Sequence, residues 1–295
     1  MAGPRIALVT RRPAPGHDRD LPVLARAVDA AGAEARVVGW DDPDVDWSGF
    51  DLAVIRSTWD YSWRPGEYVA WAERCARLTR LANPVDVVRW NTDKRYLGEL
   101  ARAGVPVVPT RYTAPGESVR FLEGGDGDGD GEFVVKPTSG AGARYAARYR
   151  ADERDAALAH IARMHAEGFT AMVQPYMRSI DTTGERALVH IGGQFLHAAQ
   201  KGAVLASGTA YDADKVAHPD LRPWRPTDAE LSVAERALAA VPGSPDLLYA
   251  RVDLVDGDDG EPRVMELELV EPNLFLGVHP GSATHVAEQI VKAAR

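Results

Sequence analysis

The chain has 295 residues, of which 45% are hydrophobic and 26% are charged, and these proportions are ordinary for a globular protein with a buried core. At roughly 100–200 residues per domain, this length predicts two or three domains or lobes. The net charge of −9 argues against a nucleic-acid partner, because proteins that bind a long phosphate backbone present a basic face.

The cysteine content and the apolar runs bear on the compartment. The single cysteine, Cys75, cannot form an intramolecular disulfide, which suits a reducing cytosol. Its helical surroundings favour a structural thiol over a catalytic one. The first apolar run, residues 5–10, is too short for a signal sequence, and no stretch approaches the roughly 18–20 apolar residues that span a bilayer. We therefore expect a cytoplasmic protein without a membrane partner, and the sequence leaves a homo-oligomer open.

The first 85 residues alternate between strand-like and helix-like segments. Apolar runs predict strands at residues 5–10, 34–40 and 50–58, and amphipathic patterns predict helices at 21–32 and 65–81. Such alternation is typical of βαβ units and a parallel sheet.

Polar and aromatic residues follow the third of these strands. Ligands of parallel sheets gather at the carboxyl ends of the strands, so this segment is a candidate substrate rim. Its candidate contacts are Arg56, Ser57, Thr58, Asp60 and Tyr61. For the aromatic side chains, the alternative is that they plug a domain interface.

Two lysines occupy sequence positions that are unusual for an ordinary solvent-exposed lysine. Asn91 or Thr92 can cap a helix that carries Lys94 in its first turn and ends before Gly104. The helix dipole favours negative charge there, so Lys94 is a candidate ligand contact, with a solvated lysine as the alternative. The second, Lys136, closes an apolar run that begins at residue 133.

Small residues follow Lys136. A fixed cation and a loop whose backbone N–H groups can approach an anion closely are the two parts of a phosphate site. The loop residues are Ser139, Gly140, Ala141 and Gly142. The acidic stretch before this strand, residues 123–132, begins like a calcium loop, but the twelfth position from Asp126 is Pro137 instead of a bidentate carboxylate. We expect a solvated loop there.

The second half of the chain has a different pattern. A helix is predicted at residues 151–168 and a strand at 169–177, followed by a hairpin at 185–201 around Gly192-Gly193. A helix at 228–241 precedes the last two strands. This order favours two α+β lobes rich in antiparallel strands.

The last two strands carry acidic residues in alternation. Arg251 and Asp253 share one face, and Glu266 and Glu268 share a face of the next strand, which a short turn joins as an antiparallel neighbour. Carboxylates on adjacent strands repel unless a cation lies between them, and hard oxygen ligands suit Mg²⁺ better than zinc. The candidate ligands are Asp253, Glu268, Glu271 and Asn273. The alternative is an edge strand with one solvent-exposed face, on which Glu266 and Glu268 would be ordinary surface residues.

The chain lacks the two commonest sequence motifs for binding nucleotide phosphates. The chain contains no G-x-x-x-x-G-K-S/T, and no G-x-G-x-x-G follows the first strand, which argues against a nicotinamide dinucleotide fold of the usual kind. Lys94, Lys136 and Lys201, with a glycine-rich loop and Mg²⁺, would instead form a triphosphate site of another kind.

From about Val85 to the carboxyl end, the sequence resembles the ATP-grasp superfamily, and the preceding α/β third is similar to that superfamily's N-terminal domain. The resemblance implies a parallel-sheet α/β domain at residues 1–85, and two α+β lobes, at 86–177 and 178–295, that clamp ATP between them.

The resemblance also implies roles for individual residues. Lys94 and Lys136 would hold phosphates, and the small-residue loop would close over them. The linker Gln174, Pro175, Tyr176 and Met177 would contact adenine, and Glu185, with Asp181 as its rival, would bind the ribose. Asp253 and the Glu271-x-Asn273 ending would hold Mg²⁺, with two ions expected. Pro272 and the nearby Glu268 leave the ligand set open. Arg251, Lys201 and Lys136 would be catalytic, with Arg251 also contacting the substrate.

Five segments, at residues 56–61, 88–97, 104–110, 133–143 and 266–276, are similar to the branch of this superfamily that includes O-ureido-D-serine cyclo-ligases of D-cycloserine biosynthesis. This implies a small amino-acid-like substrate, activation of its carboxylate as an acyl phosphate, and closure of a ring with release of CO₂ and ammonia. The alternatives are an intermolecular amino-acid or peptide ligase, a non-catalytic ATP-binding sensor and, more weakly, a Rossmann-type reductase.

Overall fold

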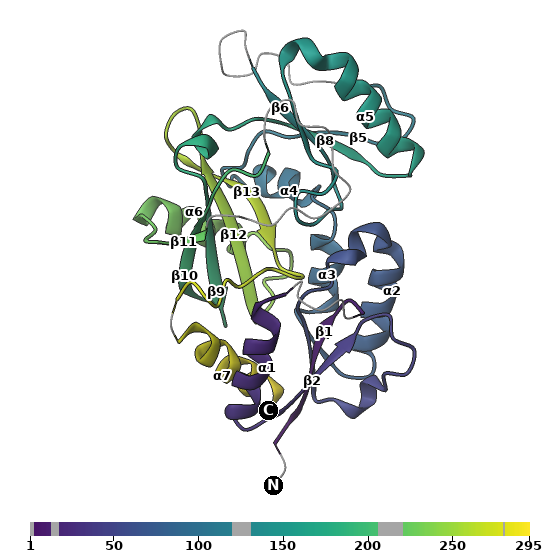
Figure 1. The fold of residues 1–295 in the computed structure, drawn as a ribbon, viewed down its shortest axis with the longest axis vertical. Coiled ribbons are helices and arrows are strands. Elements are labelled where there is room, and N and C mark those ends of the chain that lie inside the picture. Colours follow the sequence, from purple (N-terminus) through teal and green to yellow (C-terminus); the bar gives the residue numbers. More distant parts are fainter. Residues whose placement is uncertain (1–2, 13–17, 120–130, 206–220, 280) are drawn as a thin grey trace.

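The structure is a computed structural model that describes residues 3–12, 18–119, 131–205, 221–279 and 281–295 (Figure 1). The acidic residues 126–130, considered above as a calcium-like loop, lie outside the described part. The described chain forms three sheets, one parallel and two antiparallel, as the sequence predicts.

The N-terminal sheet is parallel and has the strand order β2-β1-β3-β4. Its strands are β1 (Arg5–Thr10), β2 (Glu34–Gly39), β3 (Leu52–Ile55) and β4 (Arg80–Ala82). Alternate residues of β1 face opposite sides: Ile6 and Leu8 pack with α1 (Asp20–Ala30), while Ala7 and Val9 pack with α2 (Pro65–Ala76). The prediction that the second helix reaches Leu81 is wrong, because residues 80–82 form a short strand beside β3.

The middle sheet is antiparallel and has the order β5-β8-β6-β7. It contains β5 (Arg111–Thr113), β6 (Phe133–Pro137), β7 (Ala147–Tyr149) and β8 (Ala171–Pro175). The helix α5 (Arg154–Ala166) covers one face, where Ile161 and Met164 pack against Val135 and Val173.

The third sheet is also antiparallel and has the order β11-β10-β9-β12-β13. Its strands are β9 (Glu185–Ile191), β10 (Gln194–Lys201), β11 (Leu221–Trp224), β12 (Tyr249–Asp256) and β13 (Pro262–Glu268), and α6 (Asp228–Ala239) packs against it. The predicted hairpin is confirmed. Gly192 and Gly193 form its turn with φ of +57° and +77°, which glycine adopts without a steric cost.

Three further helices differ from the sequence prediction. Instead of one helix that carries Lys94 in its first turn, the chain forms α3 (Val85–Asn91) and α4 (Tyr96–Arg102) with Lys94 in the turn between them. The Lys94 backbone N–H donates to Thr138 O at 2.8 Å, which interrupts helical bonding at this point. A third helix, α7 (Ser282–Ala294), was not predicted, and it packs beside α1 on the N-terminal sheet (Figure 1).

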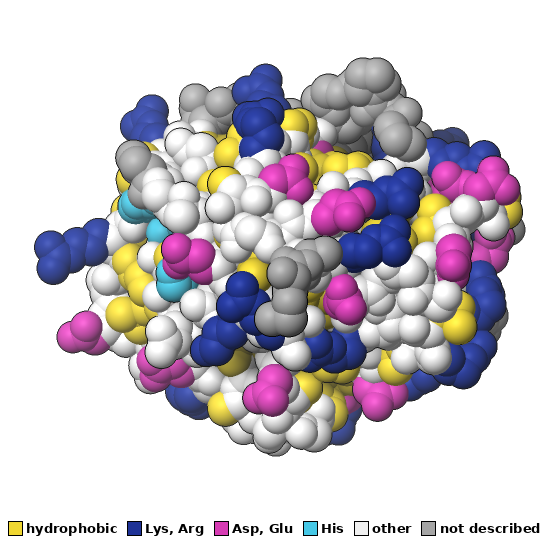
Figure 2. Space-filling view, turned by 90° about the horizontal axis from the view of Figure 1, so that it is seen from below, with side chains coloured by type: hydrophobic (Ala, Val, Ile, Leu, Met, Phe, Trp, Pro, Cys, Tyr) yellow, Lys and Arg dark blue, Asp and Glu magenta, His cyan; other side chains and the backbone are white. Residues whose placement is uncertain are grey.

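On the face drawn in Figure 2, acidic and basic side chains are interspersed among apolar ones. In the described ranges, every helix is too short or too polar to cross a bilayer.

Candidate active site

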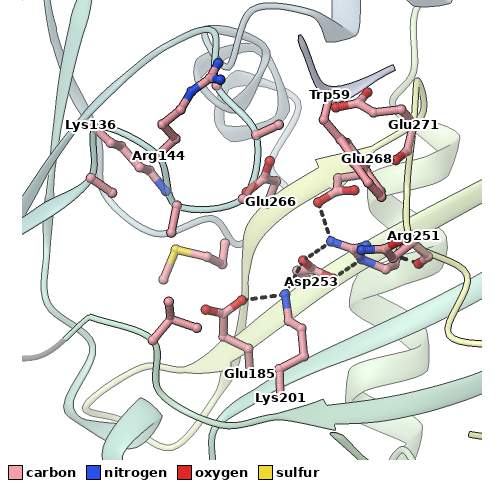
Figure 3. A pocket seen from close by; sticks show the side chains of 18 of the residues that line it. Trp59, Lys136, Arg144, Glu185, Lys201, Arg251, Asp253, Glu266, Glu268 and Glu271 are labelled. Carbon is pink, nitrogen blue, oxygen red and sulfur yellow. Dashed lines mark hydrogen bonds and ion pairs between the residues drawn. The ribbon is translucent and has the colours of Figure 1, made fainter. Parts of the chain in front are cut away.

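A cavity of about 1410 Å³ lies where the three sheets meet, and most of the predicted site residues line it (Figure 3). The predicted residues at its surface are Asp60, Lys94, Lys136, Gly140, Ala141, Gly142, Gln174, Pro175, Tyr176, Met177, Glu185, Lys201, Arg251, Asp253, Glu268, Glu271 and Asn273. Residues from distant parts of the chain are thus brought to one place, as a shared ligand would require.

Five predicted residues do not reach the cavity surface. Ser139 is buried and donates to Thr92 O at 2.9 Å, so it anchors the small-residue loop from behind. The other four belong to the expected rim: Arg56, Ser57, Thr58 and Tyr61.

The rim residues other than Asp60 tie elements together behind the cavity wall. Arg56 donates to Pro272 O at 2.6 Å, and its guanidinium lies 5.2 Å from the ring centroid of Tyr249. This contact joins the end of β3 to the segment after β13. Thr58 shares a hydrogen bond of 2.9 Å with the hydroxyl of Tyr68. The segment after β3 does lie beside the cavity, as its place at the carboxyl end of a strand predicts, but these four side chains are buried behind the cavity wall.

A buried ion cluster is centred on Asp253. Its carboxylate accepts from Arg251 Nε at 2.8 Å and from Lys201 Nζ at 2.5 Å, and the Lys201 ammonium also lies 2.8 Å from Glu185 (Figure 3). Burial alone would raise the pKa of Asp253. The charges of Arg251 and Lys201 outweigh it, so the pKa is held well below its usual range.

The pairing of β12 with β13 explains this geometry. Arg251 lies opposite Glu268, and Asp253 lies opposite Glu266, so the predicted antiparallel neighbours are confirmed. Arg251 forms an ion pair with Glu268 and also donates to Asn273 O at 3.1 Å. One arginine therefore holds β13 and the segment beyond it in place.

Lys94 bridges β13 and the small-residue loop. Its Nζ lies 3.2 Å from Glu266 Oε1 and donates to Gly140 O at 2.6 Å. Burial lowers the pKa of Lys94, but nearby glutamates, Glu266 first among them, outweigh burial and raise it. The ammonium thus stays charged within reach of the loop.

Lys136 differs from the other two lysines. It lies near the end of β6 and lines the cavity, and among the described residues it forms no ion pair. Burial lowers its pKa, and the positive charges of Lys94 and Lys201 lower it further, against the pull of Glu266. A cation in this position would be stabilised by an incoming anion.

The wall formed by β13 and the segment after it is rich in carboxyl groups. Burial raises the pKa of Glu268 to about 7, against the charge of Arg251, and raises the pKa of Glu271 to about 8, with repulsion from Glu268 adding to it. Within the described ranges, no three carboxylate, imidazole or thiolate side chains are grouped to hold a metal ion by themselves. Mg²⁺ commonly binds one or two carboxylates together with phosphate oxygens, so this wall fits a magnesium ion that binds with a nucleotide.

Another part of the cavity lining is apolar. Val134, Tyr176, Met177 and Ile180 form one cluster, and Met265 packs against it. These residues offer a flat ring a dry slot beside the backbone of residues 174–177.

Of the two acids proposed near the ribose, the cavity is lined by Glu185. Its rival, Asp181, accepts from the Tyr176 hydroxyl at 2.6 Å and lies 3.6 Å from Arg148.

Sequence reasoning missed several residues that line the cavity. Glu266 was placed beside the candidate metal ligands but not included among them, and the tryptophans after the third strand were weighed mainly as residues that fill a domain interface. Trp59 and Trp63 both line the cavity, and Trp59 Nε1 donates to Glu271 O at 3.2 Å. Arg144 at the end of the small-residue loop and Phe275, whose ring lies 5.1 Å from the Arg251 guanidinium, carried no signal of their own.

Comparisons with known proteins identify the family of this chain. The family model of the N-terminal domain of D-cycloserine synthetase DcsG matches residues 6–83. The cycloserine biosynthesis protein DcsG of Streptomyces lavendulae is 39% identical over 97% of this chain and 98% of its own length.

Solved structures extend the comparison to the fold. A crystal structure of D-cycloserine synthetase DcsG has 35% identity and a TM-score of 0.88 over 99% of this chain and all of that one. An ATP-grasp RimK domain protein from Sphaerobacter thermophilus, only 18% identical, has a TM-score of 0.63 over 98% of both chains. The chain therefore belongs to the D-cycloserine synthetase family of carbon–nitrogen ligases and has the ATP-grasp fold.

Proposed function

We propose that the protein binds Mg·ATP in this cavity, activates the carboxylate of O-ureido-D-serine as an acyl phosphate, and closes the ring of D-cycloserine. The observation that carries the proposal is the 39% identity over nearly the whole chain to a protein of cycloserine biosynthesis. The proposal is supported by the meeting, in one cavity, of Lys94, Lys136, Lys201 and Arg251 with Asp253, Glu266, Glu268 and Glu271.

The nucleotide would lie between the two antiparallel sheets. Adenine would occupy the apolar slot beside Gln174, Pro175, Tyr176 and Met177, and Glu185 would accept from the ribose hydroxyls. The phosphates would lie under the loop of Ser139, Gly140, Ala141 and Gly142, with the lysines around them. In this arrangement the units 1–85, 86–177 and 178–295 each contribute one wall.

Magnesium would be held by Asp253, Glu268, Glu271 and Asn273, as one ion or two, and would neutralise phosphate charge during transfer. Asp253 is ion-paired in the structure, and Glu268 and Glu271 have raised pKa values, so a divalent cation would stabilise the ionised carboxylates on this wall.

In the first step, an oxygen of the substrate carboxylate attacks the γ-phosphorus. The bond to the bridging oxygen breaks, and ADP leaves with the electron pair. Lys94, Lys136 and Lys201 neutralise the charge on the transferred group, and Arg251 holds the acyl-phosphate oxygens.

In the second step, the nitrogen bonded to oxygen in the ureido group attacks the activated carbonyl carbon, and inorganic phosphate leaves. Both groups belong to one molecule, so the effective concentration is high and little general-base assistance is needed. One water then cleaves the carbamoyl group, which is released as CO₂ and ammonia.

The test is ADP release from Mg·ATP by the purified protein, with O-ureido-D-serine, its L-enantiomer and D-serine in parallel and mass analysis of the products. We expect ADP only with the ureido D-compound, together with the mass of cycloserine. No response to any of the three would refute the substrate assignment.

Two rivals predict other outcomes of this assay. An intermolecular ligase would need a second amino acid or amine and would give a heavier product. A non-catalytic ATP-binding sensor would bind the nucleotide, but no carboxylate would stimulate ADP release.

A further inference from the structure

Arg144 is a cavity-lining cation with no role assigned above. It follows the small-residue loop, and in the part of the chain that the structure describes it forms no ion pair with a carboxylate. Instead, its guanidinium carbon lies 3.5 Å from the centroid of the Trp63 ring, and Nη2 donates to the Ser62 hydroxyl. Burial lowers the pKa of Arg144 to about 10. The side chain is thus a partly desolvated positive charge that no described carboxylate contacts as an ion pair, although the charge of Asp60 acts on it from further away.

These two partners orient the guanidinium without saturating it. Stacking on an indole leaves the N–H groups free at the edge of the guanidinium plane, and a guanidinium has five such donors. Ser62 accepts from one nitrogen. The remaining donors suit a phosphoryl or carboxylate group, which arginine binds through two parallel hydrogen bonds.

The backbone holds Arg144 in a defined place. Its neighbours Ala143 and Tyr145 have φ of +57° and +58°, in the left-handed region that costs a non-glycine residue about 1 kcal/mol. The Tyr145 ring packs edge-on against Trp63, with 5.0 Å between centroids. The end of the loop is therefore fixed against the 3₁₀ helix Trp59–Trp63 of the N-terminal unit.

Lys136 and Arg144 lie to the left in Figure 3 and Glu268 and Glu271 to the right, with Glu266 of β13 between them. Between Lys136 and Arg144 the chain runs through Gly140, Ala141 and Gly142, all at the cavity surface. An anionic group on this side would meet the small-residue loop and two cations that form no ion pair with any described residue.

We propose that Arg144 binds the terminal phosphoryl group of ATP, and that Ser62 and Trp63 position it for that contact. The inference rests on the proposed function only in taking ATP as the nucleotide. Under this proposal, the phosphate-binding end of the site includes two residues of the N-terminal unit, Ser62 and Trp63. It would be complete only when the N-terminal unit is packed against the small-residue loop.

The experiment measures the affinity of the full chain for Mg·AMPPNP and for Mg·ADP by calorimetry, in the wild type and in Arg144→Gln. Losing a hydrogen bond to a charged group costs about 1.5–3 kcal/mol, so Arg144→Gln should weaken AMPPNP binding about 10- to 100-fold and leave ADP binding unchanged. Arg150→Gln is the matched control. Arg150 pairs with Asp152 at the surface and is absent from the cavity lining, so neither affinity should change.

Equal weakening of both nucleotides, or no change in either, would overturn the proposal, since both would indicate a purely structural contact. Should Arg144→Gln fail to fold by circular dichroism, Ser62→Ala takes its place, and a change for AMPPNP alone is again expected. A wild type that binds AMPPNP but releases no ADP with O-ureido-D-serine would refute the substrate assignment and leave the role of Arg144 standing. A wild type that binds neither nucleotide would refute both.

Discussion

At the scale of single residues, the cavity cations differ in what neutralises them. Lys94 pairs with Glu266, and Lys201 with Asp253 and Glu185, whereas Lys136 has no such partner among the described residues. A lysine that is paired with a carboxylate can stabilise the fold in addition to binding a ligand. A lysine whose pKa is lowered by burial is a cost to the fold, so its presence points to a ligand.

Lys136→Ala should therefore lower the rate of ADP release by about 10²–10³-fold, the usual effect of removing one donor to a developing charge. The melting temperature should stay the same or rise, because an unfavourable buried charge is removed. The readouts are coupled-enzyme ADP release and thermal unfolding. Lys292→Ala, an exposed lysine on α7, is the control. Normal turnover in Lys136→Ala would remove this residue from the mechanism.

Asp253→Asn tests the ion cluster in a different way. We expect the magnesium dependence of ADP release to shift to higher concentrations, because a ligand charge is lost. We also expect the free energy of unfolding to fall by about 3 kcal/mol, since Arg251 and Lys201 lose their shared carboxylate. A magnesium titration and a urea unfolding curve measure the two effects. An unchanged titration would exclude Asp253 as a ligand.

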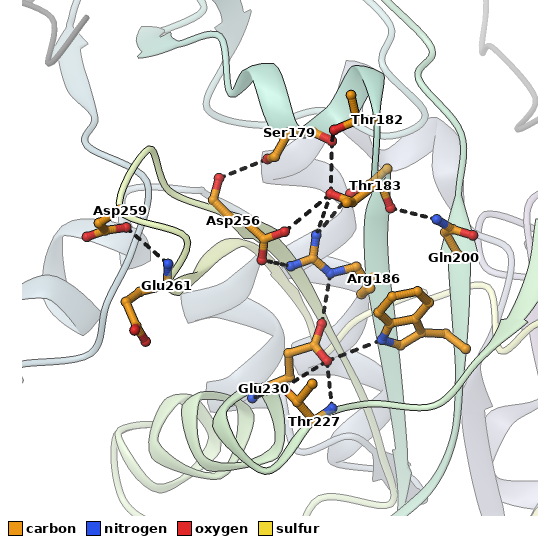
Figure 4. Close-up of polar contacts among 12 residues, drawn as sticks. Ser179, Thr182, Thr183, Arg186, Gln200, Thr227, Glu230, Asp256, Asp259 and Glu261 are labelled. Carbon is orange, nitrogen blue, oxygen red and sulfur yellow. Dashed lines mark hydrogen bonds and ion pairs between the residues drawn. The ribbon is translucent and has the colours of Figure 1, made fainter.

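At the scale of elements, a second buried ion network joins α6 to the third sheet (Figure 4). Arg186 on β9 donates from Nε to Glu230 at 2.8 Å and pairs with Asp256 at the end of β12. Glu230 also accepts from the backbone N–H of Thr227 at 2.7 Å, which completes a capping box at the start of α6. One carboxylate thus caps a helix and fixes its position on the sheet.

Glu230→Ala should cost about 3–5 kcal/mol of unfolding free energy, because it leaves the buried Arg186 without its Nε partner and removes the cap. Glu235→Ala, an exposed glutamate on the same helix, should change stability by no more than about 0.5 kcal/mol. Urea denaturation compares the two variants. Similar small effects for both would mean that the network contributes little.

The interior of β9 gives the stability a pH dependence. Burial lowers the pKa of His190 from 6.5 to about 4, against a smaller opposing effect of the Leu188 backbone. Between pH 6.5 and 4, the unfolded chain binds a proton that the folded chain does not. Stability therefore falls as the pH falls through this window, by up to about 3 kcal/mol from this residue.

His190→Leu should remove the contribution of this residue to the pH dependence of the unfolding free energy and leave the contributions of other groups unchanged. The measurement is the midpoint of urea unfolding at intervals from pH 7.5 to pH 4.5 for both proteins. Parallel curves across the whole range would show that His190 does not titrate with the lowered pKa.

At the scale of the whole molecule, the N-terminal unit and the third sheet share one core. Ile6 and Leu24 of the first unit pack in the same cluster as Val189 of β9 and Ile290 of α7. The side chain of Asn83 donates to Tyr249 O at 2.9 Å and to Leu269 O at 2.7 Å, and so binds the backbone of the third sheet directly. The cavity wall that these units form together is therefore held by apolar packing and by hydrogen bonds from the Asn83 side chain to backbone carbonyls.

We expect the two units to unfold together as a result. Ile290→Ala should lower the free energy of unfolding by about 2–5 kcal/mol. The unfolding midpoints followed by tryptophan fluorescence and by far-ultraviolet circular dichroism should shift by the same amount. Fluorescence reports mainly on the N-terminal unit, because five of the seven tryptophans lie in the first 85 residues. Leu158→Ala, a half-exposed leucine on α5, is the control. Separate transitions for the two probes would show that the shared core does not couple the units.

The sequence by itself determined the elements whose signal is local. Alternation along β9 and β10, the turn at Gly192-Gly193 and the acidic pattern of β12 and β13 depend on neighbours in the chain, and the structure contains them as predicted. Lys136 and the acids of β12 and β13 could be named from the sequence, because ionisable residues inside apolar strands need a partner. Glu185 was named only from the resemblance to the ATP-grasp superfamily.

Only the tertiary structure decided which of these residues face the cavity and which support it. Arg56 has the sequence context of a ligand contact, yet its guanidinium is taken by Pro272 O and the Tyr249 ring, which lie more than 190 residues away in the chain. Arg144 gave no sequence signal, because its contact with Trp63 exists only after the two units meet. Side-chain direction and pairing across long sequence separations depend on packing, and no local pattern encodes them.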